Sequence, residues 1–193
     1  MSEIRKIGNT NWLLDFEEAK ELARKERKPI LLQFEIEKCG GCKKMYSHTY
    51  LDEKVSQELS SRFILLMLNI REAHKVRREY AAYWTPSFYF LDYNGKSYYT
   101  FKGYFPPDQF RIHLRIGFSE ASIPKGRFKE AMEYLNSGYD DLSKNILYPK
   151  ILVLKGMIDY LHDRDNLKFR AVIKSIKEQY PESPEASQYF WDE

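Results

Sequence analysis

The chain has 193 residues, of which 43% are hydrophobic and 31% are charged, and this balance is that of a globular protein, which excludes the disordered and fibrous classes. The formal net charge is only +3, and basic residues are interleaved with acids, which argues against a nucleic-acid-binding surface. The length suits one substantial domain or a domain with a smaller appendage, and no apolar run approaches the roughly 18–20 residues that a membrane span needs.

The N-terminus does not have the pattern of a secretory signal. Residues 1–20 are polar and acidic by turns and lack a basic start followed by an apolar core. We therefore expect a cytoplasmic protein. The alternative is a periplasmic protein whose signal peptide has already been removed.

The first part of the chain starts with a helical pattern that passes into a strand. Apolar residues at helical spacing predict a helix over residues 12–27, with Asn11 as its N-cap. Pro29 ends this helix. The apolar run over residues 30–34 has the composition of a buried strand.

Helices and strands continue to alternate up to about residue 118. We expect helices over residues 43–50, 53–61, 71–82 and 106–116, and strands over residues 63–68, 87–91 and 96–101. The dipeptide Asn94-Gly95 between the last two strands is typical of a β-hairpin. Parallel strands joined by helices and followed by a hairpin predict an α/β fold, with a mixed sheet covered by helices on both faces.

No strand pattern recurs beyond about residue 119. Helical patterns cover residues 127–135, 149–161, 167–180 and 184–191. We therefore divide the chain into a first domain over residues 1–118 and a small all-α domain over residues 119–193, with the boundary between about Gly117 and Lys125. The C-terminal helices loosely resemble tetratricopeptide units, which form partner-binding platforms. The alternative is a small bundle that covers one side of the first domain.

Cys39 and Cys42 are the only cysteines, and two residues separate them. A four-ligand zinc site needs two further soft ligands, and the histidines show no paired spacing. A purely structural disulfide across such a short loop gains little loop-closure entropy. The pair follows a buried strand at the first turn of a helix, where unpaired N–H groups and the helix dipole stabilise a thiolate. These observations favour a redox-active pair that needs no metal and no organic cofactor.

Four segments of the first domain have the order and spacing of a known family. They are KPILLQFEIEKCGGCKKM, YLDEKVSQELSSRFILLMLNI, YAAYWTPSFYFLDYNGK and GYFPPDQFRIHL. On these segments, residues 28–118 resemble the thioredoxin superfamily. Within it they most resemble the thioredoxin-like proteins related to the C-terminal domains of disulfide-reducing transmembrane proteins. The resemblance implies a thioredoxin-like mixed sheet flanked by helices.

The resemblance also implies roles for particular residues. Cys39 would be the nucleophile and Cys42 the resolving thiol of a redox-active disulfide. Pro86 would be a cis-proline lying against that disulfide, and Thr85 would bind the backbone of a substrate chain by strand-like hydrogen bonds. The substrate-binding residues would be Lys38, Gly40, Gly41, Thr85 and Pro86.

Three positions depart from the usual thioredoxin pattern. Gln33 stands six residues before the first cysteine, where the family usually has a buried Asp that manages the proton of the resolving thiol. Glu35, Glu37 or water would then take over that task. Lys38 replaces the usual Trp and makes the substrate surface less apolar, and Gly41 replaces a Pro in the turn. Reductase, oxidase and isomerase activities therefore all remain open.

Together these features predict a protein-disulfide oxidoreductase of the thioredoxin-like type. Its expected partners are protein disulfide substrates and a reductase or oxidase that recycles the cysteine pair, with no nucleic acid. The alternative is a non-catalytic binding or chaperone module that uses the fold and the C-terminal helices as a platform.

Overall fold

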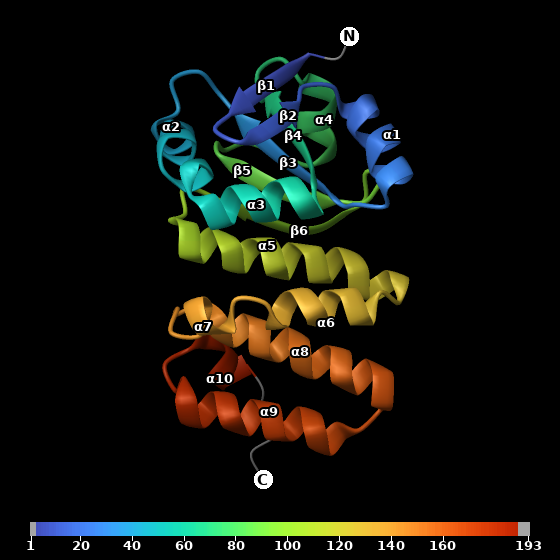
Figure 1. Ribbon diagram of the computed structural model, residues 1–193, viewed down its shortest axis with the longest axis vertical. Coiled ribbons are helices and arrows are strands. Elements are labelled where there is room, and N and C mark those ends of the chain that lie inside the picture. Colours follow the sequence, from blue (N-terminus) through green and yellow to red (C-terminus); the bar gives the residue numbers. More distant parts are fainter. Residues whose placement is uncertain (1–2, 189–193) are drawn as a thin grey trace. The chain divides into compact units, whose positions relative to one another are not determined.

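The computed structural model describes residues 3–188 of the chain (Figure 1). The chain divides into two compact units, the first ending at Arg111 and the second beginning at Ile112. This division lies inside helix α5 (Pro107–Ser122), so the first turn of α5 belongs to one unit and its remainder to the other. The sequence analysis placed its boundary after residue 118, where the strand patterns have stopped.

The first unit is built on a six-stranded mixed sheet with the strand order β1-β2-β4-β3-β5-β6. The strands are β1 (Ile4–Ile7), β2 (Thr10–Leu13), β3 (Ile30–Glu35), β4 (Ile64–Asn69), β5 (Ser87–Leu91) and β6 (Ser97–Lys102). β2, β4 and β3 run parallel to one another, and β5 and β6 extend the sheet antiparallel beyond β3. The predicted mixed sheet with a hairpin near its end is therefore confirmed.

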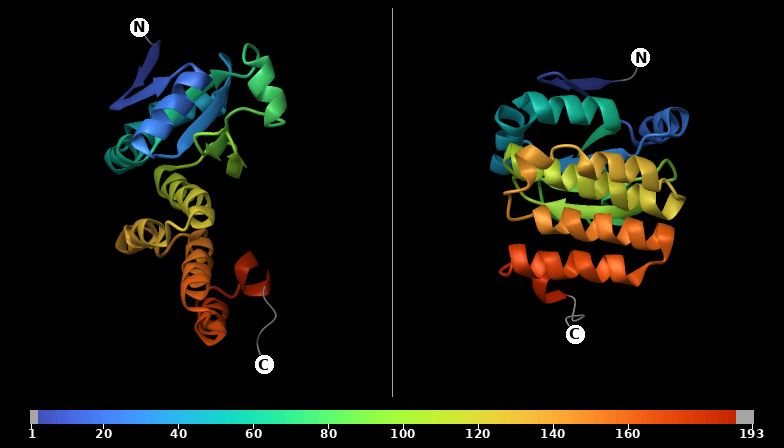
Figure 2. Two further views of the ribbon diagram at one scale, coloured as in Figure 1. Left: turned by 90° about the vertical axis from the view of Figure 1, so that its right-hand side faces the viewer. Right: turned by 60° about the horizontal axis from the view of Figure 1, so that its bottom comes forward.

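Helices lie on both faces of this sheet (Figures 1 and 2). The helices of the first unit before α5 are α1 (Phe16–Glu26), α2 (Gly40–Ser47), α3 (Glu53–Arg62) and α4 (His74–Glu79), with a 3-10 turn η1 (Thr49–Leu51). Because side chains alternate along a strand, Ile30, Leu32 and Phe34 of β3 share one face, where they pack with α1 and α4. Gln33 and Glu35 lie on the other face, which α2 covers. This alternation decides which polar side chains lie behind the cysteine pair.

The predicted N-terminal helix was partly wrong, because a β-hairpin precedes it. β1 and β2 pair antiparallel around a turn at Gly8, whose φ is +55°, so Trp12 and Leu13 lie in a strand. The helix α1 begins only after Asp15, which is its N-cap in place of Asn11 and accepts a backbone N–H from the first turn. β2 pairs with β4 at Leu13, so a contact distant in sequence outweighs the local helical spacing.

Asp92 organises the turn of the β5–β6 hairpin. Its Oδ1 accepts N–H groups from Asn94 at 2.9 Å and from Lys96 at 3.0 Å. Gly95, with a φ of +86°, is the turn residue in the left-handed region. The Tyr80 hydroxyl donates to the Gly95 carbonyl oxygen at 2.6 Å, which ties the turn to the end of α4.

We expect Gly95→Ala to lower the free energy of unfolding by about 1–2 kcal/mol, because alanine tolerates positive φ poorly. Its Cβ would also lie 3.0 Å from the Tyr80 hydroxyl oxygen. Urea denaturation measures the loss. The control is Asn94→Ala at the exposed neighbouring position, where the change should stay below about 0.5 kcal/mol. Equal losses in the two variants would contradict this explanation of the turn.

The part of the second unit that the structure describes contains helices and no strands, as we predicted for the small all-α domain. After α5 and a 3-10 turn η2 (Ile123–Lys125), its helices are α6 (Phe128–Asn136), α7 (Tyr139–Leu142), α8 (Tyr148–Asp163), α9 (Asn166–Gln179) and α10 (Pro184–Gln188). Residues 189–191 of the helix expected over 184–191 lie outside the described residues. None of the helices within residues 3–188 is long and apolar enough to cross a membrane. The tetratricopeptide resemblance stays a prediction.

A buried cluster and a buried arginine both contribute to the packing of the second unit. Val153 of α8 packs with Phe169 and Ile173 of α9 in a buried cluster. Arg115 of α5 is 1% exposed, and its Nε donates to the Ser137 carbonyl oxygen at 2.8 Å. A buried guanidinium needs such an acceptor, so this bond fixes the end of α6 against α5.

Candidate active site

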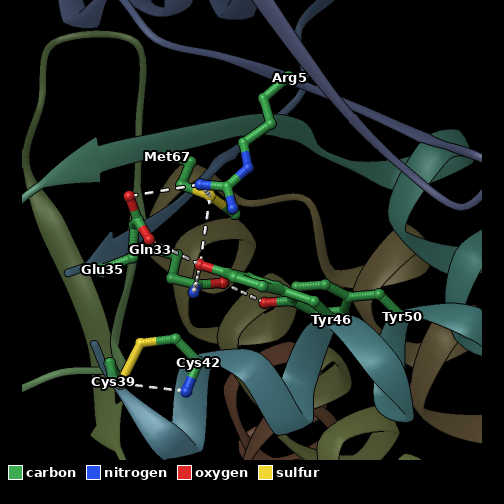
Figure 3. The surroundings of a disulfide bond; sticks show 8 residues. All are labelled: Arg5, Gln33, Glu35, Cys39, Cys42, Tyr46, Tyr50 and Met67. Carbon is green, nitrogen blue, oxygen red and sulfur yellow. Dashed lines mark hydrogen bonds and ion pairs between the residues drawn. A yellow bond between two sulfur atoms is a disulfide. The ribbon is translucent and has the colours of Figure 1, made fainter. Parts of the chain in front are cut away.

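Cys39 and Cys42 form a disulfide at the N-terminal end of α2 (Figure 3). Their Cα atoms are 5.2 Å apart, which is within the usual range for a disulfide. β3 ends at Glu35, and the Cys39 N–H donates to the Ile36 carbonyl oxygen at 3.1 Å. The cysteine pair therefore lies at the strand-to-helix turn that the sequence predicts.

The two cysteines have different surroundings. Cys39 is 9% exposed and Cys42 only 1%. Cys39 is the N-cap of α2, and its Sγ accepts the N–H of Cys42 at 3.1 Å. The N–H groups of a first helical turn and the positive end of the helix dipole stabilise a thiolate at this position. Cys39 is therefore the better placed of the two to carry negative charge and to meet a second molecule.

The segment Thr85–Pro86 lies against the cysteine turn. The peptide bond between these two residues is cis, the isomer that the family resemblance implies. A Cβ on Gly41 would lie 2.9 Å from Pro86 Cδ, whereas a Cβ on Gly40 would meet nothing within 4 Å. The turn thus touches the proline at Gly41, where there is no space for a side chain. The Gly103 N–H donates to the Pro86 carbonyl oxygen at 2.8 Å and holds the proline beside β6.

The structure brings the predicted site residues together at one edge of the sheet. Lys38 and Gly40 are exposed on either side of Cys39, Thr85 is half-buried and Pro86 is buried. Pro86 lies 44 residues after Cys42 in the sequence, and the fold brings it beside the cysteine turn, as the family resemblance implies.

Behind the disulfide, the fully buried Gln33 belongs to a chain of hydrogen bonds (Figure 3). The Tyr50 hydroxyl donates to the Gln33 side-chain oxygen, and Gln33 Nε2 donates to the Tyr46 hydroxyl oxygen at 3.3 Å. The Tyr46 hydroxyl donates in turn to Glu35 Oε2 at 3.1 Å. Arg5 lies 3.3 Å from Glu35 Oε1. Buried polar groups need such partners, and here they come from α2, η1 and β1.

The hydroxyls of this chain stay protonated. Burial raises the pKa of Tyr46, and the nearby Glu35 carboxylate raises it further. Complete burial likewise raises the pKa of Tyr50. An amide does not titrate, so Gln33 and the two tyrosines form a neutral network beside α2. Tyr46 follows Cys42 by four residues, which places both on the same side of the helix.

The sequence analysis did not find all of these residues. Tyr50 is fully buried, whereas Tyr83 is 75% exposed. Trp84 was given no role, although it directly precedes Thr85 and is 59% exposed. Its position two residues before Pro86 could have indicated that Trp84 lies beside the cysteine pair.

Comparison with known proteins identifies the family of the chain. The family described as a thioredoxin-like domain matches residues 16–116, which is more than half of the sequence. The chain belongs to the thioredoxin-like family. No curated protein matches it. A thioredoxin-like fold with a CxxC pair is the arrangement of thiol–disulfide oxidoreductases in general, and this chain has both.

Solved structures resemble the thioredoxin-like part of the chain. A thioredoxin from Thermus thermophilus is 26% identical over 53% of this chain and 82% of its own, with a TM-score of 0.48. A putative disulphide-isomerase from Bacteroides thetaiotaomicron is 23% identical over 54% and 88%, with a TM-score of 0.50. A DsbH oxidoreductase is 16% identical over 61% and 92%, also with a TM-score of 0.50. The last two support the fold.

We expect Gly41→Ala to slow disulfide exchange at this thioredoxin-like site by about tenfold. Its Cβ would displace Pro86 or the turn, and small misplacements near reacting atoms are costly. The matched control is Gly40→Ala, where the added Cβ meets open space and the rate should stay within about twofold. The measurement is dithiothreitol-driven reduction of insulin. Identical rates in the two variants would show that the contact with Pro86 has no part in exchange.

We expect Gln33→Leu to cost about 1–3 kcal/mol of unfolding free energy, because the buried Tyr50 hydroxyl loses its acceptor. In the double variant Gln33→Leu/Tyr50→Phe no hydroxyl is left without a partner. The double variant should therefore lose less unfolding free energy than the two single variants together, as measured by urea denaturation. Strict additivity would contradict the hydrogen bond between Tyr50 and Gln33.

Proposed function

We propose that this protein is a thiol–disulfide oxidoreductase that exchanges disulfides with protein substrates through Cys39 and Cys42. The observation that carries the proposal is the placement of the disulfide. It lies at a helix N-terminus, its more exposed sulfur accepts a backbone N–H, and Pro86 touches its turn at Gly41. Membership of the thioredoxin-like family supports the same conclusion.

In the reducing direction, the thiolate of reduced Cys39 attacks one sulfur of the substrate disulfide. A mixed disulfide forms, and the first substrate thiolate leaves and takes a proton from water. The thiolate of Cys42 then attacks Cys39 Sγ, which breaks the mixed disulfide and releases the second substrate thiolate. The substrate disulfide thus gains two electrons and two protons, and Cys39–Cys42 returns to the disulfide form.

The segment before β5 provides the surface on which the substrate chain lies. In our proposal an extended substrate backbone runs along Thr85 and Pro86 and forms strand-like hydrogen bonds there. This places the substrate cysteine over the cysteine turn. Lys38, Gly40 and Gly41 border the same surface.

Cys42 has to lose a proton before it attacks, and Gln33 does not accept one. The two carboxylate oxygens of Glu35 already face Arg5 and Tyr46. This leaves the exposed Glu37 and water as the proton acceptors for Cys42 in our proposal.

Turnover requires a partner that restores the cysteine pair. A dithiol reductase would supply two electrons for reductive work, and an oxidase would remove them for the reverse reaction. The reduction potential of the pair, measured by titration against glutathione, determines which direction is favoured.

We expect Cys39→Ser to abolish insulin-disulfide reduction, because the variant has no attacking thiolate. The matched variant Cys42→Ser keeps the attacking thiol but does not resolve the intermediate. It should accumulate a mixed disulfide with the substrate, seen as a heavier species on a non-reducing gel and released by dithiothreitol. Reduction that survives in Cys39→Ser would overturn the assignment.

A binding or chaperone module without catalysis would give different cysteine chemistry. The rate of Cys39 alkylation against pH distinguishes the two functions. A thiol that titrates below about 8.5, the value of free cysteine, supports exchange. An ordinary titration together with no exchange activity would favour the binding module.

A further inference from the structure

Exposed lysines surround the cysteine turn. Lys38 directly precedes Cys39, and Lys43 and Lys44 directly follow Cys42 in the first turns of α2. A fourth lysine, Lys102, is the last residue of β6. It pairs with Ser87 of the neighbouring strand β5, and Ser87 directly follows Pro86. All four side chains are exposed.

Aromatic rings hold two of these lysines beside the site. Lys44 Nζ lies 4.5 Å from the centroid of the Tyr104 ring, and a Cβ on Gly41 would lie 3.9 Å from Tyr104 Cβ. Lys102 Nζ lies 4.0 Å from the centroid of the Tyr83 ring. Such cation–π contacts stabilise a cation while leaving part of it open to solvent.

Acidic side chains do not balance these charges locally. Over residues 36–44, 83–87 and 102–104, Glu37 is the only acid in the sequence. Glu35, just before the first of these segments, already forms an ion pair with Arg5. The segments that border the disulfide therefore carry four lysines and one acid, although the whole chain is close to neutral.

The same surface has apolar area for a polypeptide. Trp84 and Tyr83 are 59% and 75% exposed and directly precede Thr85–Pro86. Exposed aromatic side chains of this size are typical of the centre of protein interfaces. A partner that uses this surface should therefore carry both apolar and acidic side chains.

We propose that the preferred substrates are polypeptides with acidic residues flanking the cysteine that reacts with Cys39. This inference rests on the proposed function and adds the substrate class. Acidic flanks would meet Lys38, Lys43 and Lys44 on one side of the substrate sulfur and Lys102 on the other. Complementary charge accelerates encounter and fixes register, and it loses its effect at high salt.

The test uses three peptide disulfides of equal length whose cysteines are flanked by Glu, Gln or Lys. Each is mixed with the pre-reduced full-length protein, and the rate of thiol release is divided by the rate with dithiothreitol, which corrects for the reactivity of the peptide itself. At low salt we expect the Glu peptide to react about tenfold faster than the Lys peptide. At about 0.5 M salt the ratio should fall to within about twofold, because screening lengths become a few ångströms.

Matched double variants locate the effect. Lys44→Gln/Lys102→Gln should reduce the ratio of Glu-peptide to Lys-peptide rates by at least half. The control Lys25→Gln/Lys75→Gln changes the net charge equally at exposed lysines of α1 and α4, which are not among the four lysines of this surface, and should leave that ratio unchanged.

The outcomes separate this inference from the proposed function. Equal reaction of all three peptides would overturn the acidic preference while leaving the exchange activity established. A preference that both double variants weaken equally would overturn the assignment to this surface. Absence of exchange with every peptide would overturn the proposed function and the substrate class together.

Discussion

The contact between Gly41 and Pro86 depends on where β3 ends and β5 begins. β3 and β5 run antiparallel with Phe34 opposite Ser87, so the chain leaves β3 at the same edge of the sheet where it enters β5. The cysteine turn follows the first strand and Pro86 precedes the second. Their approach is close enough that a Cβ at residue 41 would meet Pro86 Cδ at 2.9 Å. The position of the disulfide beside a surface for an extended chain follows from this strand pairing.

The same strand sets the polar environment behind the disulfide. β3 is buried on both faces, and its alternation directs Gln33 toward α2 and away from the apolar cluster that contains Leu32 and Phe34. A buried amide needs hydrogen-bond partners, which Tyr46 and Tyr50 provide. The thioredoxin-like scaffold is therefore kept while the buried acid of the usual pattern is replaced by a neutral network.

Strands of the sheet centre could be predicted from sequence, because a strand buried on both faces needs a largely apolar run, as residues 30–34, 63–68 and 87–91 have. The β1–β2 hairpin could not be predicted in this way. Its strands have four residues each and mixed polarity, and β2 is held by pairing with β4, about fifty positions away. Local spacing therefore favoured a helix where the sheet imposed a strand.

By itself, the sequence determined the family, the α/β class of the first unit, the helical nature of the second and the position of Cys39 and Cys42 at the start of a helix. These follow from local patterns and from the order of motifs. Only the tertiary structure decided that Gly41 is the residue that touches Pro86, that Tyr46 and Tyr50 satisfy Gln33, and that Lys102 pairs with Ser87, the residue after Pro86. Each of these contacts joins residues far apart in the chain, and their distances depend on strand register and helix packing, which no local pattern encodes.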